Sequence, residues 1–195
     1  MGTELLVIGK GDNLITMILD NLSSNNYIPK IKVYNNLGLP IINSFDHDEF
    51  DVEILTNVNI DDYESLTLGV YHPKHKMKII QTIGPSINRF VNVIHNGLDI
   101  SKTSKLGRGI LINSKVSIAA HTTIGDYCSI NPGSNIAGNV TIGEGTTIGM
   151  GVNIIDGIKI GKNTIIGAGS LVTRDIPDNV VAYGSPCKII KNNEA

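Results

Sequence analysis

Aliphatic side chains recur at every sixth residue through the second half of the chain. Fourteen successive positions carry the pattern, namely Ile94, Ile100, Leu106, Ile112, Ile118, Ile124, Ile130, Ile136, Ile142, Ile148, Ile154, Ile160, Ile166 and Val172. Branched aliphatics are too infrequent in ordinary chains for such a run to arise by chance. A helix would show spacings of three and four, and a single strand a spacing of two, so a period of six indicates a solenoid.

Each six-residue unit is expected to form one short strand and one corner, and three units close a triangular coil around the inward aliphatics. The next residue is often small, which relieves crowding at the corner. The residue four beyond the aliphatic is mostly small or β-branched and can fill the interior. Coils stack about 4.8 Å apart. Because one coil contains eighteen residues, Leu106, Ile124 and Ile142 should lie above one another. The spacing leaves the hand open, although the general rule for parallel crossovers favours a right hand.

Residues 1–88 have a different pattern, which predicts a small α/β unit. Strands are expected at residues 5–8, 31–34 and 66–70. Helices are expected at 14–22 and 74–83, the second ended by Pro85.

A turn containing Gly9, Lys10 and Gly11 joins the first predicted strand to the first predicted helix. Such turns bind phosphate in doubly wound sheets because the helix N-terminus offers free amides. The same residues also suit an ordinary turn without a ligand. The turn therefore predicts either a phosphate site or a purely structural connection.

Composition narrows the range of partners. Sixteen basic and eighteen acidic residues give a net charge of -2, which argues against nucleic acid as a partner. Cys128 and Cys187 lack metal-ligand spacing and are interpreted as reduced thiols, so no metal is expected. Neither a signal peptide nor a membrane-spanning run is recognisable, and Leu6 stands where a myristoylation signal needs Ser or Thr. A cytoplasmic protein is therefore expected.

Several segments resemble the hexapeptide-repeat acyltransferases. These are the repeats at 124–169, the sequence IAGNVTIG at 136–143 and the closing YGSPCKII at 183–190. The similarity is to the branch of sialic acid O-acetyltransferase-like proteins and nucleotide-amino-sugar N-acetyltransferases. It implies a mainly β chain, in which a left-handed parallel β-helix with a C-terminal tail spans residues 89–195. A small Rossmann-like domain at 1–88, holding the nucleotide sugar, is implied to precede it.

The resemblance also implies an activity. The expected reaction is transfer of an acetyl group from acetyl-CoA to the amino group of a nucleotide-linked amino-deoxy sugar in surface glycan biosynthesis, by a homotrimer. An O-acetyltransferase acting on sialic acid or another sugar is the nearest alternative. A non-catalytic trimeric β-helix is a third reading, and a carbonic anhydrase-like relative would need several convergent histidines. An acyl group longer than acetyl also stays open.

Two residues are candidates for the chemistry, because histidine suits proton transfer near neutral pH. His121 is the candidate base, yet the histidine of the family stands one residue earlier, where this chain has Ala120. His121 is therefore a shifted base or a substrate ligand, unless catalysis proceeds by positioning alone. Asn113 matches a family asparagine and could orient His121 or the sugar, with an outward polar residue as the alternative. His95 is interpreted as structural.

The remaining candidates follow from the same resemblance. Contacts with coenzyme A, in a groove between neighbouring coils, are implied for Ser129, Met150 and Ala168. Lys188 and Arg174 are assigned as contacts of its phosphates. The alternative is that both are solvated charges on the surface. Contacts with the nucleotide sugar are assigned to Gly9, Lys10, Gly11, Asn35, Asn36 and Gly69. The two asparagines stand where the family carries an acidic pair.

Overall fold

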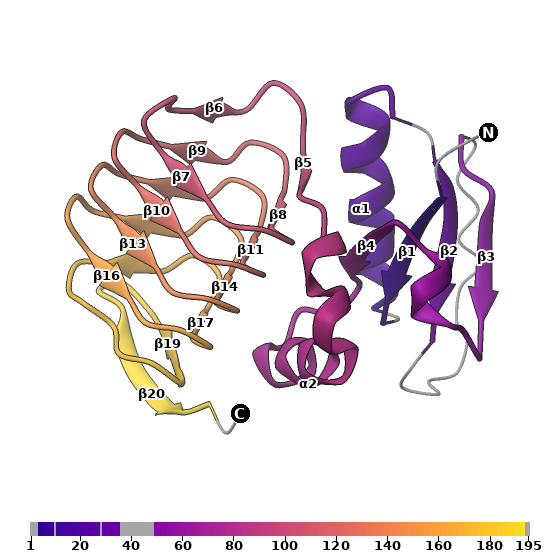
Figure 1. Ribbon diagram of the computed structural model, residues 1–195. Helices are drawn as coiled ribbons and strands as arrows, with labels where there is room; N and C mark the ends of the chain where they lie inside the picture. The colour runs from indigo at the N-terminus through magenta and orange to yellow at the C-terminus, as the bar shows by residue number, and fades with distance from the viewer. Residues whose placement is uncertain (1–3, 10, 28, 36–48, 194–195) are drawn as a thin grey trace.

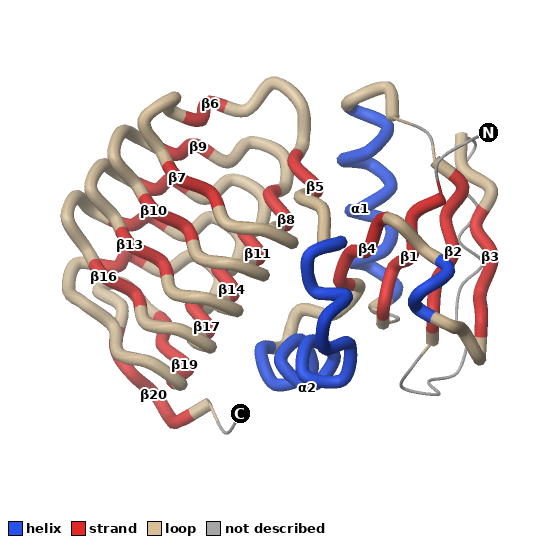
Figure 2. The backbone as a smooth tube through the Cα atoms, in the orientation of Figure 1, coloured by secondary structure: helices blue, strands red, loops and turns tan. Residues whose placement is uncertain are grey.

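The computed structural model describes residues 4–9, 11–27, 29–35 and 49–193. A layered α/β part lies beside a stack of coils, with the helix α2 (Pro73–Ile83) between them (Figure 1). The tube view shows how short the strands of the coils are compared with those of the α/β part (Figure 2). Within the described residues, no helix is long and apolar enough to cross a membrane.

The α/β part contains a four-stranded parallel sheet with the order β3-β2-β1-β4. The strands are β1 (Glu4–Ile8), β2 (Lys30–Tyr34), β3 (Val52–Leu55) and β4 (Ser65–Leu68). The three predicted strands are confirmed, with β4 ending two residues earlier than expected. The edge strand β3 was not predicted, and its side chains are only partly buried or exposed.

Two helices cover opposite faces of this sheet. Leu5 and Val7 pack in one cluster with the buried side of α1 (Asp12–Ser24), whereas Leu6 and Ile8 pack with α2. This division follows from the alternation of side chains along a strand. α2 ends at Gly84, whose φ of 59° is left-handed, so this glycine ends the helix before Pro85 does.

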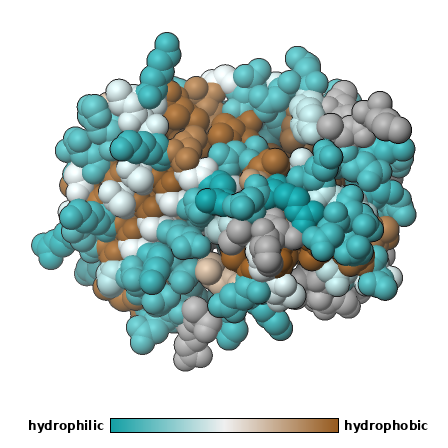
Figure 3. Space-filling model, viewed as in Figure 1, coloured by the Kyte–Doolittle hydropathy of each residue, from teal (hydrophilic) through white to brown (hydrophobic). Residues whose placement is uncertain are grey.

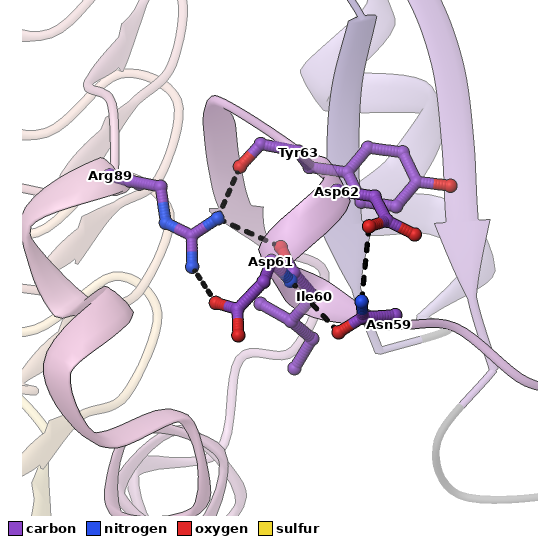
Figure 4. A network of polar contacts seen from close by, with 6 residues as sticks. All are labelled: Asn59, Ile60, Asp61, Asp62, Tyr63 and Arg89. Atoms are coloured by element: carbon purple, nitrogen blue, oxygen red, sulfur yellow. Dashed lines mark hydrogen bonds and ion pairs between the residues drawn. The ribbon is translucent and has the colours of Figure 1, made fainter.

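Two short 3₁₀ helices are tied together beside the sheet. They are η1 (Ile60–Asp62) and η2 (Gly84–Arg89). The Arg89 guanidinium donates to the carbonyl oxygens of Ile60 and Tyr63 at 2.9 and 2.6 Å and to Asp61 Oδ1 at 2.6 Å (Figure 4). This network fixes the segment that leads from α2 into the coils.

The coils consist of two-residue parallel strands in three stacked sheets. These strands are β5 (Val93–Ile94), β6 (Asp99–Ile100), β7 (Lys105–Leu106), β8 (Leu111–Ile112), β9 (Ser117–Ile118), β10 (Thr123–Ile124), β11 (Ser129–Ile130), β12 (Asn135–Ile136), β13 (Thr141–Ile142), β14 (Thr147–Ile148), β15 (Asn153–Ile154), β16 (Lys159–Ile160), β17 (Ile165–Ile166) and β18 (Leu171–Val172). Leu106, Ile124 and Ile142 pair in register on one wall, as the period predicts.

The chain closes with two longer strands, β19 (Val180–Tyr183) and β20 (Lys188–Asn192). β19 pairs in parallel with β17, and β20 pairs with β19 in antiparallel fashion. The predicted C-terminal tail is therefore part of the β structure.

The interior of the coils is filled as expected. The ten residues predicted to fill the interior, each four beyond an aliphatic, are all buried, and they are Val116, Thr122, Cys128, Ser134, Val140, Thr146, Val152, Ile158, Thr164 and Ser170. The hydroxyls among them donate to backbone carbonyls; Thr146, for example, bonds Gly161 O at 2.7 Å. These polar atoms are thus satisfied inside the prism.

Small or flexible residues are needed at two positions of each corner, for two different reasons. A Cβ on Gly143, directly after Ile142, would lie 2.4 Å from the backbone nitrogen of Lys162, so the coils approach too closely for a side chain there. Two residues further on, the backbone is usually left-handed, as at Gly145 with φ of 70° and His121 with φ of 61°. Glycine relieves crowding at the first position and backbone strain at the second.

One outer wall of the prism is covered by the α/β part. On this wall the residue directly before each inward aliphatic points outward, towards the α/β part. Three of these outward residues, Leu111, Ser129 and Thr147, are buried. Equivalent residues on another wall, such as Thr123 and Thr141, are exposed. Leu111 joins the cluster under α1, so the two parts share one core.

Candidate functional site

The glycines of the candidate phosphate turn meet at the carboxyl ends of β1 and β4. Gly11 N donates to Gly69 O at 2.9 Å, and Gly69 N donates to Ile8 O at 2.9 Å. A Cβ on Gly69 would lie 2.5 Å from Gly9 O, and Gly9 itself has φ of 103°. The structure therefore brings three predicted residues together, and close packing of two loops accounts for their small size.

The other predicted contacts of the nucleotide sugar are only partly visible. Lys10 and Asn36 lie outside the described residues. Asn35 follows β2, and its backbone N–H donates to Leu55 O at 3.0 Å. Asn35 thus stands at the carboxyl edge of the sheet, near the turn of Gly9, whose N–H bonds Tyr34 O at 3.0 Å.

A hollow of about 220 Å³ opens at this edge, between the sheet and α2. Its lining is mostly apolar with a few polar groups, comprising Ile8, Tyr34, Ile60, His75, Lys78, Ile79, Thr82 and Ile83. Ligands of open α/β sheets bind at the carboxyl ends of the strands. An aromatic ring, a lysine and a histidine around an apolar floor suit a nucleotide.

A larger groove of about 660 Å³ separates the start of α2 from the last coils. It is lined by His72, Lys74, His75, Ile165, Val181, Lys191, Asn192 and Asn193, with no acidic side chain among them. Burial lowers the pKa of His72, and the neighbouring His75, Lys74 and Lys191 lower it further. The groove is therefore electropositive, and an anion would raise that pKa.

Two predicted cofactor contacts share one edge of the prism. Met150 and Ala168 each stand two residues after paired aliphatics, and Gly169 N donates to Met150 O at 2.8 Å. Met150 is 59% exposed. The predicted phosphate contacts Lys188 and Arg174 are exposed as well.

The prediction for Ser129 needs correction. This residue lies on the covered wall, 4% exposed, and its Oγ accepts a hydrogen bond from Lys76 Nζ at 2.8 Å. Its side chain therefore faces α2 and does not reach the open edge where Met150 stands.

Asn113 is buried rather than outward, at 1% exposure. Its Oδ1 accepts from Asn21 Nδ2 at 3.0 Å, and its Nδ2 donates to Ile130 O at 3.1 Å. Its amide is thus already engaged with α1 and the next coil. Within one chain Asn113 does not orient His121, because the two follow β8 and β9, which belong to different sheets. A role of Asn113 in orienting the sugar stays a prediction.

His121 is exposed at its corner. Its backbone N–H donates to Thr103 Oγ1 at 3.0 Å, and Ala120 before it accepts from Asn139 N at 2.9 Å. The side chain borders none of the hollows described here.

A third hollow, of about 360 Å³, lies where α1 meets the same edge as Met150. Met17, Asp20, Asn21, His95, Asn113, Ser114 and Pro132 line it. A structural role was predicted for His95, and its position beside this hollow was not anticipated. A signal was present, since His95 precedes Asn113 by one full coil, and the two therefore share a corner.

Comparisons with known proteins address the fold. Residues 139–174 match the bacterial transferase hexapeptide model (six repeats). A comparison with curated protein sequences finds no match. Among the described residues, no cluster of His, Cys, Asp and Glu could hold a metal ion.

Three solved structures are similar over nearly the whole chain. A mutant of perosamine N-acetyltransferase from Caulobacter crescentus, in complex with CoA and GDP-perosamine, is 23% identical with a TM-score of 0.69, covering 97% of both chains. The acetyltransferase domain of PglB from Neisseria gonorrhoeae, in complex with acetyl coenzyme A, is 19% identical with a TM-score of 0.74 and coverage of 97% and 100%. WeeI from Acinetobacter baumannii is 18% identical with a TM-score of 0.66 and coverage of 96% and 100%. The coils thus have the expected left-handed β-helix fold.

Proposed function

We propose that this chain is an acetyl-CoA-dependent N-acetyltransferase that acts on a nucleotide-linked amino sugar. One observation carries the proposal: the fold is shared over nearly the whole chain with two acetyltransferases, one crystallised with CoA and GDP-perosamine and the other with acetyl coenzyme A. Three hollows with suitable polar groups support it. The biological setting that we propose is surface glycan biosynthesis in the cytoplasm.

In this proposal, residues 1–88 form a Rossmann-like domain that holds the nucleotide. The apolar hollow beside Tyr34 and Lys78 would take the base, and the loops of Gly9, Gly11 and Gly69 would face the phosphates. Lys10, Asn35 and Asn36 would complete this subsite.

Residues 89–195 would hold coenzyme A and carry the reaction. Met150 and Ala168 are exposed on one edge of the prism, and this edge would contact the pantetheine arm of coenzyme A. Lys188 and Arg174 would meet the phosphates, and the electropositive groove at Lys191 adds to the attraction for an anionic cofactor.

The chemistry needs little beyond positioning. The sugar amine attacks the thioester carbonyl, the new C–N bond forms, the C–S bond breaks, and the proton released by the amine ends on the departing sulfur, which gives the free thiol of coenzyme A. A free amine is nucleophilic without a strong base, so Ala120 in the family's histidine position is compatible with N-acylation. An O-acyltransferase must activate a hydroxyl and would depend more on a base such as His121.

We also propose a homotrimer. Large apolar side chains are exposed on the coil part, including Met150, Ile155, Tyr183, Ile189 and Ile190. Bands of hydrophobic residues cross the coils in the surface view, whereas the α/β part is mostly hydrophilic (Figure 3). Packing of neighbouring prisms would cover part of this surface and could bring His121 of one chain to Asn113 of another.

The test is release of free thiol from acetyl-CoA in the presence of amino-sugar nucleotides. A panel that differs in base and in amino position should give thiol with at least one member, and matched hydroxyl sugars should give none. Thiol release with hydroxyl sugars alone would favour the O-acetyltransferase. No release with any sugar, together with no binding of CoA, would favour a non-catalytic β-helix.

A further inference from the structure

Lys76 is a charged side chain buried in the interface between α2 and the coils. It is 1% exposed, and among the described residues no other charged side chain is buried to this extent. Its ammonium group donates to Tyr127 O at 3.1 Å, to Ser129 Oγ at 2.8 Å and to Thr147 Oγ1 at 3.0 Å. Ser129 and Thr147 pair in register on β11 and β14, so these oxygens lie on two successive coils. An ammonium group has three N–H donors, and all three are used here.

The hydrogen bonds of Lys76 give the contact a direction rather than an attraction between opposite charges. All three acceptors are neutral, so no salt bridge offsets the cost of burying the ammonium group. An apolar side chain of similar length would fill the same space without that cost. Apolar packing is non-directional, whereas hydrogen bonds to three fixed oxygens depend on distance and angle. Lys76 therefore sets the position of α2 on the coils.

α2 connects this contact to the hollow in which we place the base of the nucleotide. Four residues of its second half line that hollow, and they are Lys78, Ile79, Thr82 and Ile83. His75 borders both the hollow and the electropositive groove that faces the last coils. Ile80 packs in one cluster with Ile8 of the sheet, so the α/β part is tied to the helix. A displacement of α2 on the coils would therefore move the nucleotide subsite relative to the prism.

We propose that Lys76 is a positioning residue for acetyl transfer: by docking α2 on two coils, it sets the distance between the bound amino sugar and the thioester. This assignment rests on the proposed function. Lys76 contacts neither substrate and acts only through the placement of the α/β part. Displacement of reacting groups by about 1 Å can lower a rate by about 100-fold. Each substrate should therefore still bind when Lys76 is lost, whereas the reaction between them should slow.

The test compares Lys76→Met with Lys159→Met, which removes an exposed lysine of β16. The acceptor is the amino-sugar nucleotide that gives the most thiol with the wild-type protein. We expect kcat of Lys76→Met to fall by about tenfold to 100-fold at saturating substrates. Calorimetric Kd values for CoA and for the nucleotide sugar, each measured alone, should stay within about twofold of the wild type. Lys159→Met should match the wild type in all three quantities.

A second substitution tests whether the hydrogen bonds themselves carry the effect. Ser129→Ala removes one acceptor of Lys76 and should lower kcat by less than Lys76→Met does. In the Lys76→Met background the same change should lower kcat no further, because the bond is already absent. An equal loss with and without Lys76 would overturn the proposal. Ser129→Ala also tests the proposal if Lys76→Met does not fold, since an unchanged kcat in that variant would contradict it.

The outcomes separate this proposal from the proposed function. If the wild-type protein acetylates an amino sugar and folded Lys76→Met keeps its kcat, only the positioning role is overturned. The same holds if the loss of activity is a weaker Kd for one substrate with kcat unchanged. If the wild-type protein acetylates no amino sugar, the proposed function fails and the positioning role fails with it.

Discussion

The ammonium group of Lys76 on α2 donates a hydrogen bond of 2.8 Å to Ser129 Oγ on the covered wall of the prism. It also bonds Tyr127 O at 3.1 Å and Thr147 Oγ1 at 3.0 Å, and Thr147 in turn donates to Tyr71 O at 2.7 Å. All three partners of Lys76 are neutral oxygens, and its side chain is buried. The hydrogen bonds of Lys76 therefore hold the α/β part on two successive coils.

The stability contributed by Lys76 should depend on pH. Burial lowers the pKa of Lys76 to about 8, whereas the unfolded chain keeps the usual 10.5. Between these values the unfolded state binds more protons, so raising the pH stabilises the folded state. From about pH 7 to about pH 10, the wild-type protein should gain about 2 to 3 kcal/mol relative to Lys76→Met.

Urea unfolding of both proteins at several pH values measures that difference. Groups common to both proteins cancel in the comparison. Lys78→Met, which removes an exposed lysine of the same helix, serves as the control and should track the wild type. A Lys76→Met difference independent of pH would contradict the assignment.

The free energy of unfolding should be more sensitive to substitution of Gly143 than to substitution of Gly133. Alanine at 143 places a Cβ against the Lys162 backbone, so Gly143→Ala should lose about 1 to 3 kcal/mol of unfolding free energy. Gly133 has φ of 74° with nothing within 4 Å of an added Cβ, and asparagine tolerates that backbone, as at Asn139. Gly133→Asn should change stability by less than about 1 kcal/mol, and equal losses in chemical denaturation would refute this account.

The contact between Asn21 and Asn113 should hold α1 on the coils. Asn21→Ala removes the donor from a buried acceptor, Asn113 Oδ1, and should cost about 1 to 3 kcal/mol. Asn13→Ala, at an exposed position of the same helix, should have little effect. Melting temperatures of the two variants provide the comparison, and a fully stable Asn21→Ala would show that the bond is dispensable.

The groove at Lys191 should attract phosphates. Lys191→Glu should weaken binding of ADP and of CoA by about threefold to tenfold at low salt, and the difference should shrink as salt is added. Lys159→Glu changes the charge equally at an exposed site on β16 and is the control. NMR titration of His72 should show its pKa rising when ADP is bound, and an unchanged pKa would place the phosphates elsewhere.

The period of six predicted the coils because each unit buries one aliphatic in the same way. It also predicted the filling residues such as Thr146, since the triangular cross-section leaves one further inward position. The covered wall was harder to recognise, although Val93, Leu111, Ser129, Thr147 and Ile165 recur every eighteenth residue before an aliphatic. These residues are apolar or small because the α/β part packs on them.

Individual site residues were less predictable because their surroundings come from distant segments. Asn113 was a candidate for orienting His121 or the sugar, yet Asn21 on α1 engages its amide. Ser129 was expected at the cofactor, yet Lys76 reaches it across more than fifty residues of sequence.

The central claim is acetyl transfer to nitrogen, and the chemical nature of the product tests it most directly. The wild-type protein is incubated with acetyl-CoA labelled with ¹³C at the carbonyl carbon and with an amino-sugar nucleotide labelled with ¹⁵N at the amino group, and the product is examined by NMR. The account predicts an amide carbonyl coupled to the nitrogen of the sugar. An ester carbonyl, or label that stays on coenzyme A across the whole panel of amino sugars, would contradict it.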